Sequence, residues 1–291
     1  MEFYKNYLVE KNFSASTIRK YVFETKRFLL EHPNAKYYCY SNLVDYMHSI
    51  SNAPIALTTR KIKLQVVKKY FDFLIETGAI QHHPCSSLYI KGNTKRGIIF
   101  YDLFTSAELE LLLNRTERYE HLAIKNKLII SFLIYQGLLP QEICGLKLKH
   151  IDAESQNVFI KGGRIHLARR LPLQPLQIVL LEEYLNNTRN RLLKTAKQKT
   201  DFLLLNFRGK PITVEDVGTL VESFRYLFPE RKLNTKTIRD SVLSNLFKEK
   251  NYLLEEVQYI AGHRWVSSTL RLKPTNQALQ HKLISKFHPL G

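Results

Sequence analysis

The chain has 291 residues, 44% hydrophobic and 24% charged, a composition that supports buried cores and excludes an intrinsically disordered protein. Its 44 Lys and Arg side chains against 26 Asp and Glu give a net charge of +18. Such an excess favours duplex DNA as a partner, because neutralised phosphates release condensed counterions, although a generally basic soluble protein would show the same balance. No apolar run approaches the roughly 20 residues that span a bilayer, so no membrane partner is expected.

Cysteine and histidine usage bears on compartment and cofactors. Cys39, Cys85 and Cys144 are odd in number and widely spaced, which favours a reducing compartment over a disulfide framework. The first residues lack the apolar core of a secretion signal, so we expect a cytoplasmic protein associated with the nucleoid. His82 and His83 precede Cys85, but no second ligand pair follows at a useful spacing. We therefore expect neither a metal site nor another cofactor.

Residues 1–92 are predicted to form a small helical domain. Ser14 can cap the first helix, and Pro33 ends it. The expected helices cover residues 14–31, 43–50 and 58–76. Basic side chains gather on the last of these helices: Arg60, Lys61, Lys63, Lys68 and Lys69. This face is expected to contact DNA phosphates, and the alternative is a face that is merely solvated.

A basic linker is expected over residues 93–104, and a second domain over residues 105–291. Thr105 opens that domain with the pattern of a capping box. Gly162 and Gly163 divide a predicted antiparallel hairpin. The hairpin strands are expected over 157–161 and 165–173, and a further short strand over 201–205. Helices are expected over 106–114, 121–135, a short piece ending at 146, 176–195, 213–227, 236–249, 253–261 and 275–287. The pattern predicts a mainly α fold with a small antiparallel β-sheet, in the α+β class.

One spacing near the end of the chain is the most informative motif. Lys236 stands three residues before Arg239, and Gly262-His263 follows some two dozen residues later. Together with the segments 135–143, 148–152 and 206–213, this order resembles the tyrosine recombinase (phage integrase) family, of the Xer-like kind, over nearly the whole chain. The resemblance implies a helical core-binding domain followed by a catalytic domain.

The resemblance also implies a chemistry and its residues. In that family a Tyr attacks the scissile phosphate, two Arg neutralise its oxygens, and Lys or His groups move protons. The implied catalytic residues here are Arg239, Lys236 and His263. Lys161 and Arg164 flank the hairpin turn; neither aligns cleanly with the family's Lys, so Lys161 is carried as a catalytic candidate and Arg164 as a DNA contact.

Two implied positions are replaced. The first Arg falls on Leu139, three residues before Glu142, and the attacking Tyr falls nine residues after His263, on Leu272. No Tyr occurs from residue 264 to residue 291. Ser267, Ser268 and Thr269 are hydroxyls nearby, but an alkoxide is harder to form than the anion of a phenol with a pKa of about 10.

We therefore expect a DNA-binding protein linked to DNA recombination or integration, catalytically impaired on its own. The alternative is an active recombinase with an unusual or partner-supplied nucleophile. A homo-oligomer or a mixed assembly with an active recombinase is expected, with the helix over 275–287 docking on a neighbouring subunit or, alternatively, on its own domain.

Overall fold

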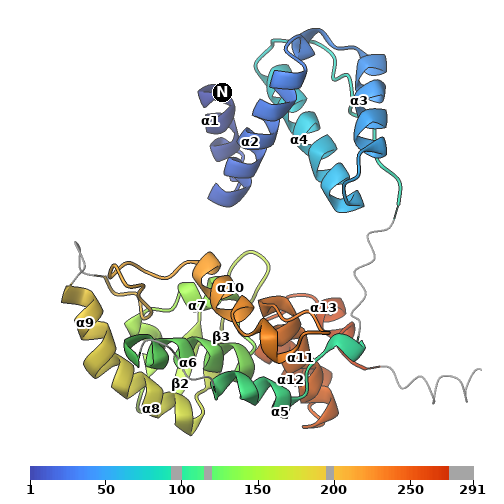
Figure 1. The fold of residues 1–291 in the computed structure, drawn as a ribbon. Helices are drawn as coiled ribbons and strands as arrows, with labels where there is room; N and C mark the ends of the chain where they lie inside the picture. Colours follow the sequence, from blue (N-terminus) through green and yellow to red (C-terminus); the bar gives the residue numbers. More distant parts are fainter. Residues whose placement is uncertain (93–99, 115–119, 195–199, 275–291) are drawn as a thin grey trace, which may run out of the picture. The chain divides into compact units, whose positions relative to one another are not determined.

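The computed structural model describes residues 1–92, 100–114, 120–194 and 200–274. The chain separates into two compact units, Met1–Arg96 and Gly97–Gly291 (Figure 1). Phe104, at the far end of the expected linker over 93–104, is buried in the core of the second unit, where its amide donates to Ser241 Oγ. The second unit therefore begins before residue 105.

The first unit is helical, as predicted. Ser14 begins the second helix because its Oγ accepts a hydrogen bond from the Thr17 amide at 3.2 Å. A helix at the very start of the chain was not predicted, and its Tyr4 and Leu8 are buried against Val66. The described helices are α1 (Glu2–Glu10), α2 (Ala15–Glu31), α3 (Tyr40–Asn52) and α4 (Leu57–Glu76), with a 3₁₀ turn at Ala35–Tyr37.

The second unit packs its helices around the second half of α6, residues 128–135, which is apolar apart from Ser131. A helical segment without a polar face is stable only when it is surrounded, and Leu128, Ile130 and Phe132 are all fully buried. Its described helices are α5 (Ser106–Glu110), α6 (Glu120–Tyr135), α7 (Pro140–Cys144), α8 (Pro175–Glu183), α9 (Arg189–Lys194), α10 (Val214–Glu222), α11 (Thr235–Lys248), α12 (Leu254–Ala261) and α13 (Val266–Leu270). The turns are 3₁₀ at Phe100–Asp102, Leu111–Leu113, Leu148–His150 and Arg225–Leu227, and π-helical at Tyr184–Thr188.

A small antiparallel sheet completes this unit. Its strands lie in the order β1 (Ile151–Asp152), β2 (Asn157–Ile160) and β3 (Arg169–Pro172). Val158 pairs with Leu171, and both are buried in the core. The prediction of a mainly α fold with a small antiparallel sheet is confirmed.

Two predicted strands are wrong in part. The segment 165–168 does not pair with β2, because the Leu167 amide donates to Gly262 O at 2.9 Å and His166 bridges His263 instead. Residues 201–205 form only isolated bridges. There the guanidinium of Arg189 takes three carbonyls that a strand would use, those of Thr200, Phe202 and Leu203.

The predicted helix over 275–287 lies outside the described residues, so its docking stays a prediction. Within the described ranges, no helix combines the length and apolarity needed to cross a bilayer. In the same ranges, His, Cys, Asp and Glu side chains form no cluster of three or more suited to a metal ion.

Candidate active site

Arg239 is held near the start of α11. Asn234 caps this helix, since its Oδ1 accepts from the amides of Lys236 and Thr237, each at 2.9 Å. The Arg239 side chain is buried and donates to the carbonyl of Gly137 and, at 2.6 Å, to that of Ala261. Burial lowers the pKa of Arg239 to about 10, so the group stays cationic at neutral pH. Its charge is thus partly satisfied by backbone oxygens.

His263 lies beside Arg239, the residue with which the family resemblance groups it. Its Nε2 lies 3.5 Å from an Arg239 Nη2, and its Nδ1 lies 3.0 Å from the Thr269 hydroxyl. Burial, followed by the charge of Arg239, lowers the pKa of His263 to about 3, so the ring is neutral at physiological pH. If Arg239 donates to Nε2, the ring proton is on Nδ1 and points to Thr269.

A buried ion pair supports this site, and the sequence analysis did not find it. Arg169 on β3 donates from Nη1 to Glu142 Oε1 at 2.7 Å and from Nη2 to Oε2 at 3.0 Å. Its Nε donates to Ile260 O at 2.7 Å. Burial raises the pKa of Glu142, but Arg169 outweighs that effect and holds it below its ordinary value. The alternation of β3, which buries Arg169 with Leu171, was the signal that could have revealed the pair.

Arg169 also explains the glycine before His263. Gly262 ends α12 with a φ of 65°, a left-handed conformation that favours glycine. A Cβ at this position would collide with the guanidinium of Arg169. The backbone can therefore turn closely over the ion pair and carry His263 to Arg239.

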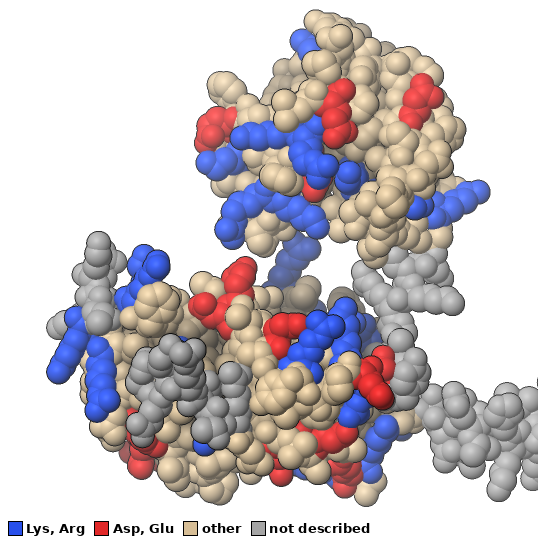
Figure 2. All heavy atoms as spheres, in the orientation of Figure 1, with Lys and Arg blue, Asp and Glu red and all other residues tan. Residues whose placement is uncertain are grey.

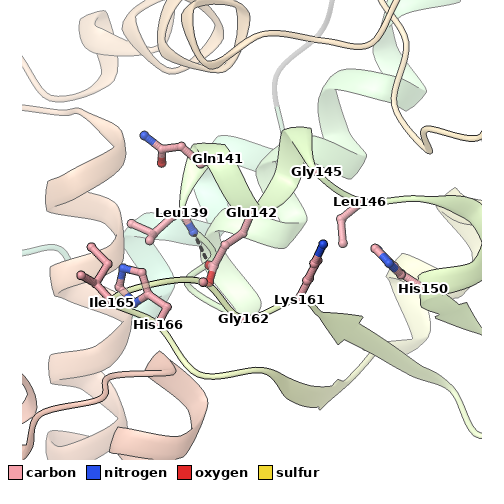
Figure 3. A pocket seen from close by; sticks show the side chains of 11 residues that line it. Leu139, Gln141, Glu142, Gly145, Leu146, His150, Lys161, Gly162, Ile165 and His166 are labelled. Carbon is pink, nitrogen blue, oxygen red and sulfur yellow. Dashed lines mark hydrogen bonds between the residues drawn. The ribbon is translucent and has the colours of Figure 1, made fainter. Parts of the chain in front are cut away.

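The two replaced positions have different surroundings. Leu139 is half-buried and lines a cavity of about 620 Å³ between α7 and the loop after β2 (Figure 3). Its amide donates to Glu142 Oε2 at 2.9 Å, the dashed line in Figure 3. Leu272 is fully buried in an apolar cluster and does not face the site: Leu243, Leu246, Val257, Ala261 and Leu272.

The other predicted site residues are exposed and lie around the buried pair of Arg239 and His263. Lys161 and Lys236 are exposed, and Lys161 lines the cavity that Leu139 also lines. Arg164 is exposed on the same loop. His166, which the sequence analysis missed, lines the cavity beside Leu139 (Figure 3), and its ring centroid is 6.2 Å from that of His263. Its Nδ1 is buried without a hydrogen-bond partner among the described residues.

The basic side chains of α4 are largely engaged within their own unit. Arg60 donates to the carbonyls of Ala53 and Ile55. The remaining bonds are Lys61 to Gly92 O, Lys68 to Ser86 O and Lys69 to Asp72. Lys63 forms no such bond to the residues the structure describes. DNA binding by this face stays a prediction.

Comparison with known families decides the affiliation. The model of the phage integrase family matches residues 102–272, more than half of the chain. The chain belongs to the phage integrase family. The predicted resemblance is thereby confirmed.

Relatives in this family match along nearly the full chain. Tyrosine recombinase XerC of Halalkalibacterium halodurans is 26% identical over 272 residues, which cover 90% of this chain and 87% of the relative. XerD of the same organism is 23% identical over 290 residues and covers 97% and 94%. Among solved structures, the Tn1549 transposon integrase in complex with circular intermediate DNA has a TM-score of 0.68 at 18% identity, covering 97% of this chain and 98% of that one. The XerH site-specific recombinase in a post-cleavage complex with difH DNA gives 0.66 at 18% identity, covering 95% and 79%. These two show that the fold is shared.

Proposed function

We propose that this protein binds duplex DNA in recombination or integration and does not cleave DNA on its own. The observation that carries the proposal is the contrast between two places in the fold. Arg239 and His263 are brought together as in a phosphate site, whereas Leu272 is fully buried among apolar side chains. The second Arg and the His of the implied site are kept, whereas the first Arg and the nucleophile are missing.

DNA binding is supported by charge and by family. Lys and Arg side chains lie over the visible face of each unit, with Asp and Glu among them (Figure 2). The similar integrase and XerH structures are both complexes with DNA. The proposed contacts are Lys63 and its basic neighbours on α4, together with Arg164. Binding of this kind needs no metal and falls steeply with added salt.

Impaired cleavage follows from two substitutions. Without a phenol at position 272 no phosphotyrosyl bond can form there. Leu139 is neutral where a second cation would offset transition-state charge, and losing one such donor costs roughly 3–4 kcal/mol. An identical subunit lacks the same Tyr, so a homo-oligomer gains nothing. Such a subunit can take part in recombination when it assembles with an active recombinase. We place this mixed assembly in the cytoplasm, on the nucleoid.

A nicked suicide substrate tests the proposal, because its cleaved product cannot be religated and even slow cleavage accumulates. We expect the protein to retard this DNA and to give no denaturant-resistant adduct. An adduct formed by the lone protein would overturn the claim of impairment. An adduct that appears only with a Tyr-bearing relative would support the mixed assembly.

One observation favours the alternative of an unusual nucleophile. The Thr269 hydroxyl lies 3.0 Å from Nδ1 of His263, a spacing typical of a nucleophile and its base. That reaction requires the tautomer with its proton on Nε2, so that Nδ1 is free to accept the Thr269 proton. Thr269 Oγ would then attack phosphorus, and the bond from phosphorus to the 5′ oxygen would break as that oxygen leaves. Thr269 is fully buried, which opposes this role. Loss of an adduct in Thr269→Val, but not in Ser267→Ala, would establish it.

A further inference from the structure

Arg271 is fixed beside the site by the residues around it. Two residues earlier, Thr269 binds His263; one residue later, Leu272 packs in the apolar cluster with Leu243 of α11. The backbone of Arg271 is therefore anchored between His263 and α11, while its own side chain is exposed. Within the described part of the chain this guanidinium forms no hydrogen bond and no ion pair.

The charge of Arg271 acts on two buried groups of the site. Burial raises the pKa of Asp240, next to Arg239, and Lys236, Arg271 and Arg239 oppose that rise. The charge of Arg271 also contributes to the low pKa of His263, after burial, Arg239 and His166. Arg271 and Lys236 are thus exposed cations at the rim of a buried cluster.

A phosphate at this rim would need such a cation. Arg239 is buried and already donates to two carbonyls, and Leu139 supplies no charge. A phosphate oxygen is best held by a guanidinium that can offer two parallel N–H groups. Arg264 and Arg271 both offer an exposed guanidinium near His263 with no acceptor bound among the described residues, but the charge of Arg271 is the one that acts on both Asp240 and His263.

We propose that Arg271 binds the DNA phosphate at this site and supplies the positive charge that Leu139 does not. The proposal rests on the proposed DNA binding and deepens it, because it assigns a phosphate ligand from the segment that in other members carries the nucleophile. The segment 266–272 would then have changed from attacking the phosphate to holding it.

Fluorescence anisotropy of a labelled duplex across a salt series tests the assignment. Arg271→Ala should weaken binding about tenfold at fixed salt and lower the slope of log affinity against log salt by roughly 0.9, the value for one lost contact. Arg271→Lys should recover part of the affinity and part of the salt slope, since Lys keeps the positive charge but lacks the two parallel N–H groups of the guanidinium. Lys273→Ala is the matched control, because it removes the same charge from an exposed side chain two residues away.

A second comparison asks whether Arg271 replaces the missing cation. Leu139→Arg should raise affinity more in the Arg271→Ala background than in the parent protein if both groups serve one phosphate. If Arg271→Ala and Lys273→Ala lose the same amount of DNA affinity while the parent shows a steep salt slope, the proposal for Arg271 is overturned and DNA binding stays in place. Parent binding that ignores salt would overturn both.

Discussion

The guanidinium of Arg169 and the carboxylate of Glu142 form a two-pronged ion pair, and neither side chain is more than 8% exposed. Breaking one partner leaves a buried charge uncompensated, so Glu142→Gln or Arg169→Met should each lower the free energy of unfolding by roughly 3–5 kcal/mol. Urea denaturation measures this loss. The control is Glu222→Gln, which breaks the exposed pair with Arg225 and should cost less than about 1 kcal/mol. Similar losses in the buried and exposed pairs would contradict the assignment.

The neutral state of His263 predicts a pH dependence of stability. Its folded pKa of about 3 lies below the ordinary value of 6.5, so between these values the unfolded chain binds a proton that the folded chain does not. This contribution to stability is complete above pH 6.5 and is lost as the pH falls towards 3. Between pH 7 and 5, where few carboxylates titrate, the unfolding free energy of the parent should fall more steeply than that of His263→Gln. Parallel curves would mean that the His263 ring is accessible and titrates normally.

The hydrogen bonds of α4 predict different effects for substitutions at two of its basic residues. Arg60 holds the carbonyls of Ala53 and Ile55, so Arg60→Ala should cost roughly 1–3 kcal/mol of stability, whatever it does to binding. Lys63→Ala should leave the unfolding free energy within about 0.5 kcal/mol and weaken binding to duplex DNA. Thermal unfolding and anisotropy on the same samples distinguish these effects. Unchanged DNA affinity in Lys63→Ala would favour a merely solvated face.

Local patterns predicted most of the helices, because caps and helical periodicity act over a few residues, whereas Arg239 and His263 were assigned to one site by the family resemblance alone. The local patterns failed where a contact with a distant part of the chain determined the backbone conformation. Arg189 takes the carbonyls of the expected strand 201–205, and the loop at Gly262 takes the amide of Leu167. No local pattern encodes such contacts.

The candidate site shows the same limit. The spacing of the motif pointed to Arg239 and His263, but the partner of Glu142 came from β3, 27 residues further along the chain. A buried acid in an apolar segment required a cation, and the inward register of Arg169 could have supplied the answer. The sequence shows that position 272 is a Leu, but the apolar cluster around it depends on tertiary packing that no local pattern predicts.

The last prediction concerns restoration of the two replaced residues. Leu139→Arg should be tolerated, because a cavity of about 620 Å³ and the Glu142 carboxylate lie beside it. Leu272→Tyr should destabilise the protein by roughly 1–3 kcal/mol, since a larger side chain enters a filled apolar cluster. The phenol hydroxyl has no acceptor in that cluster, and its desolvation favours a conformation in which the ring leaves it. Position 272 is three residues from Thr269, which contacts His263, so the ring can then reach the site.

We expect the double variant to form some adduct on the nicked substrate and each single variant less, because nucleophile and cation act on one transition state. A folded, DNA-bound double variant without an adduct would show that a further group is missing, and the loop that carries Lys161 is where we would look for it.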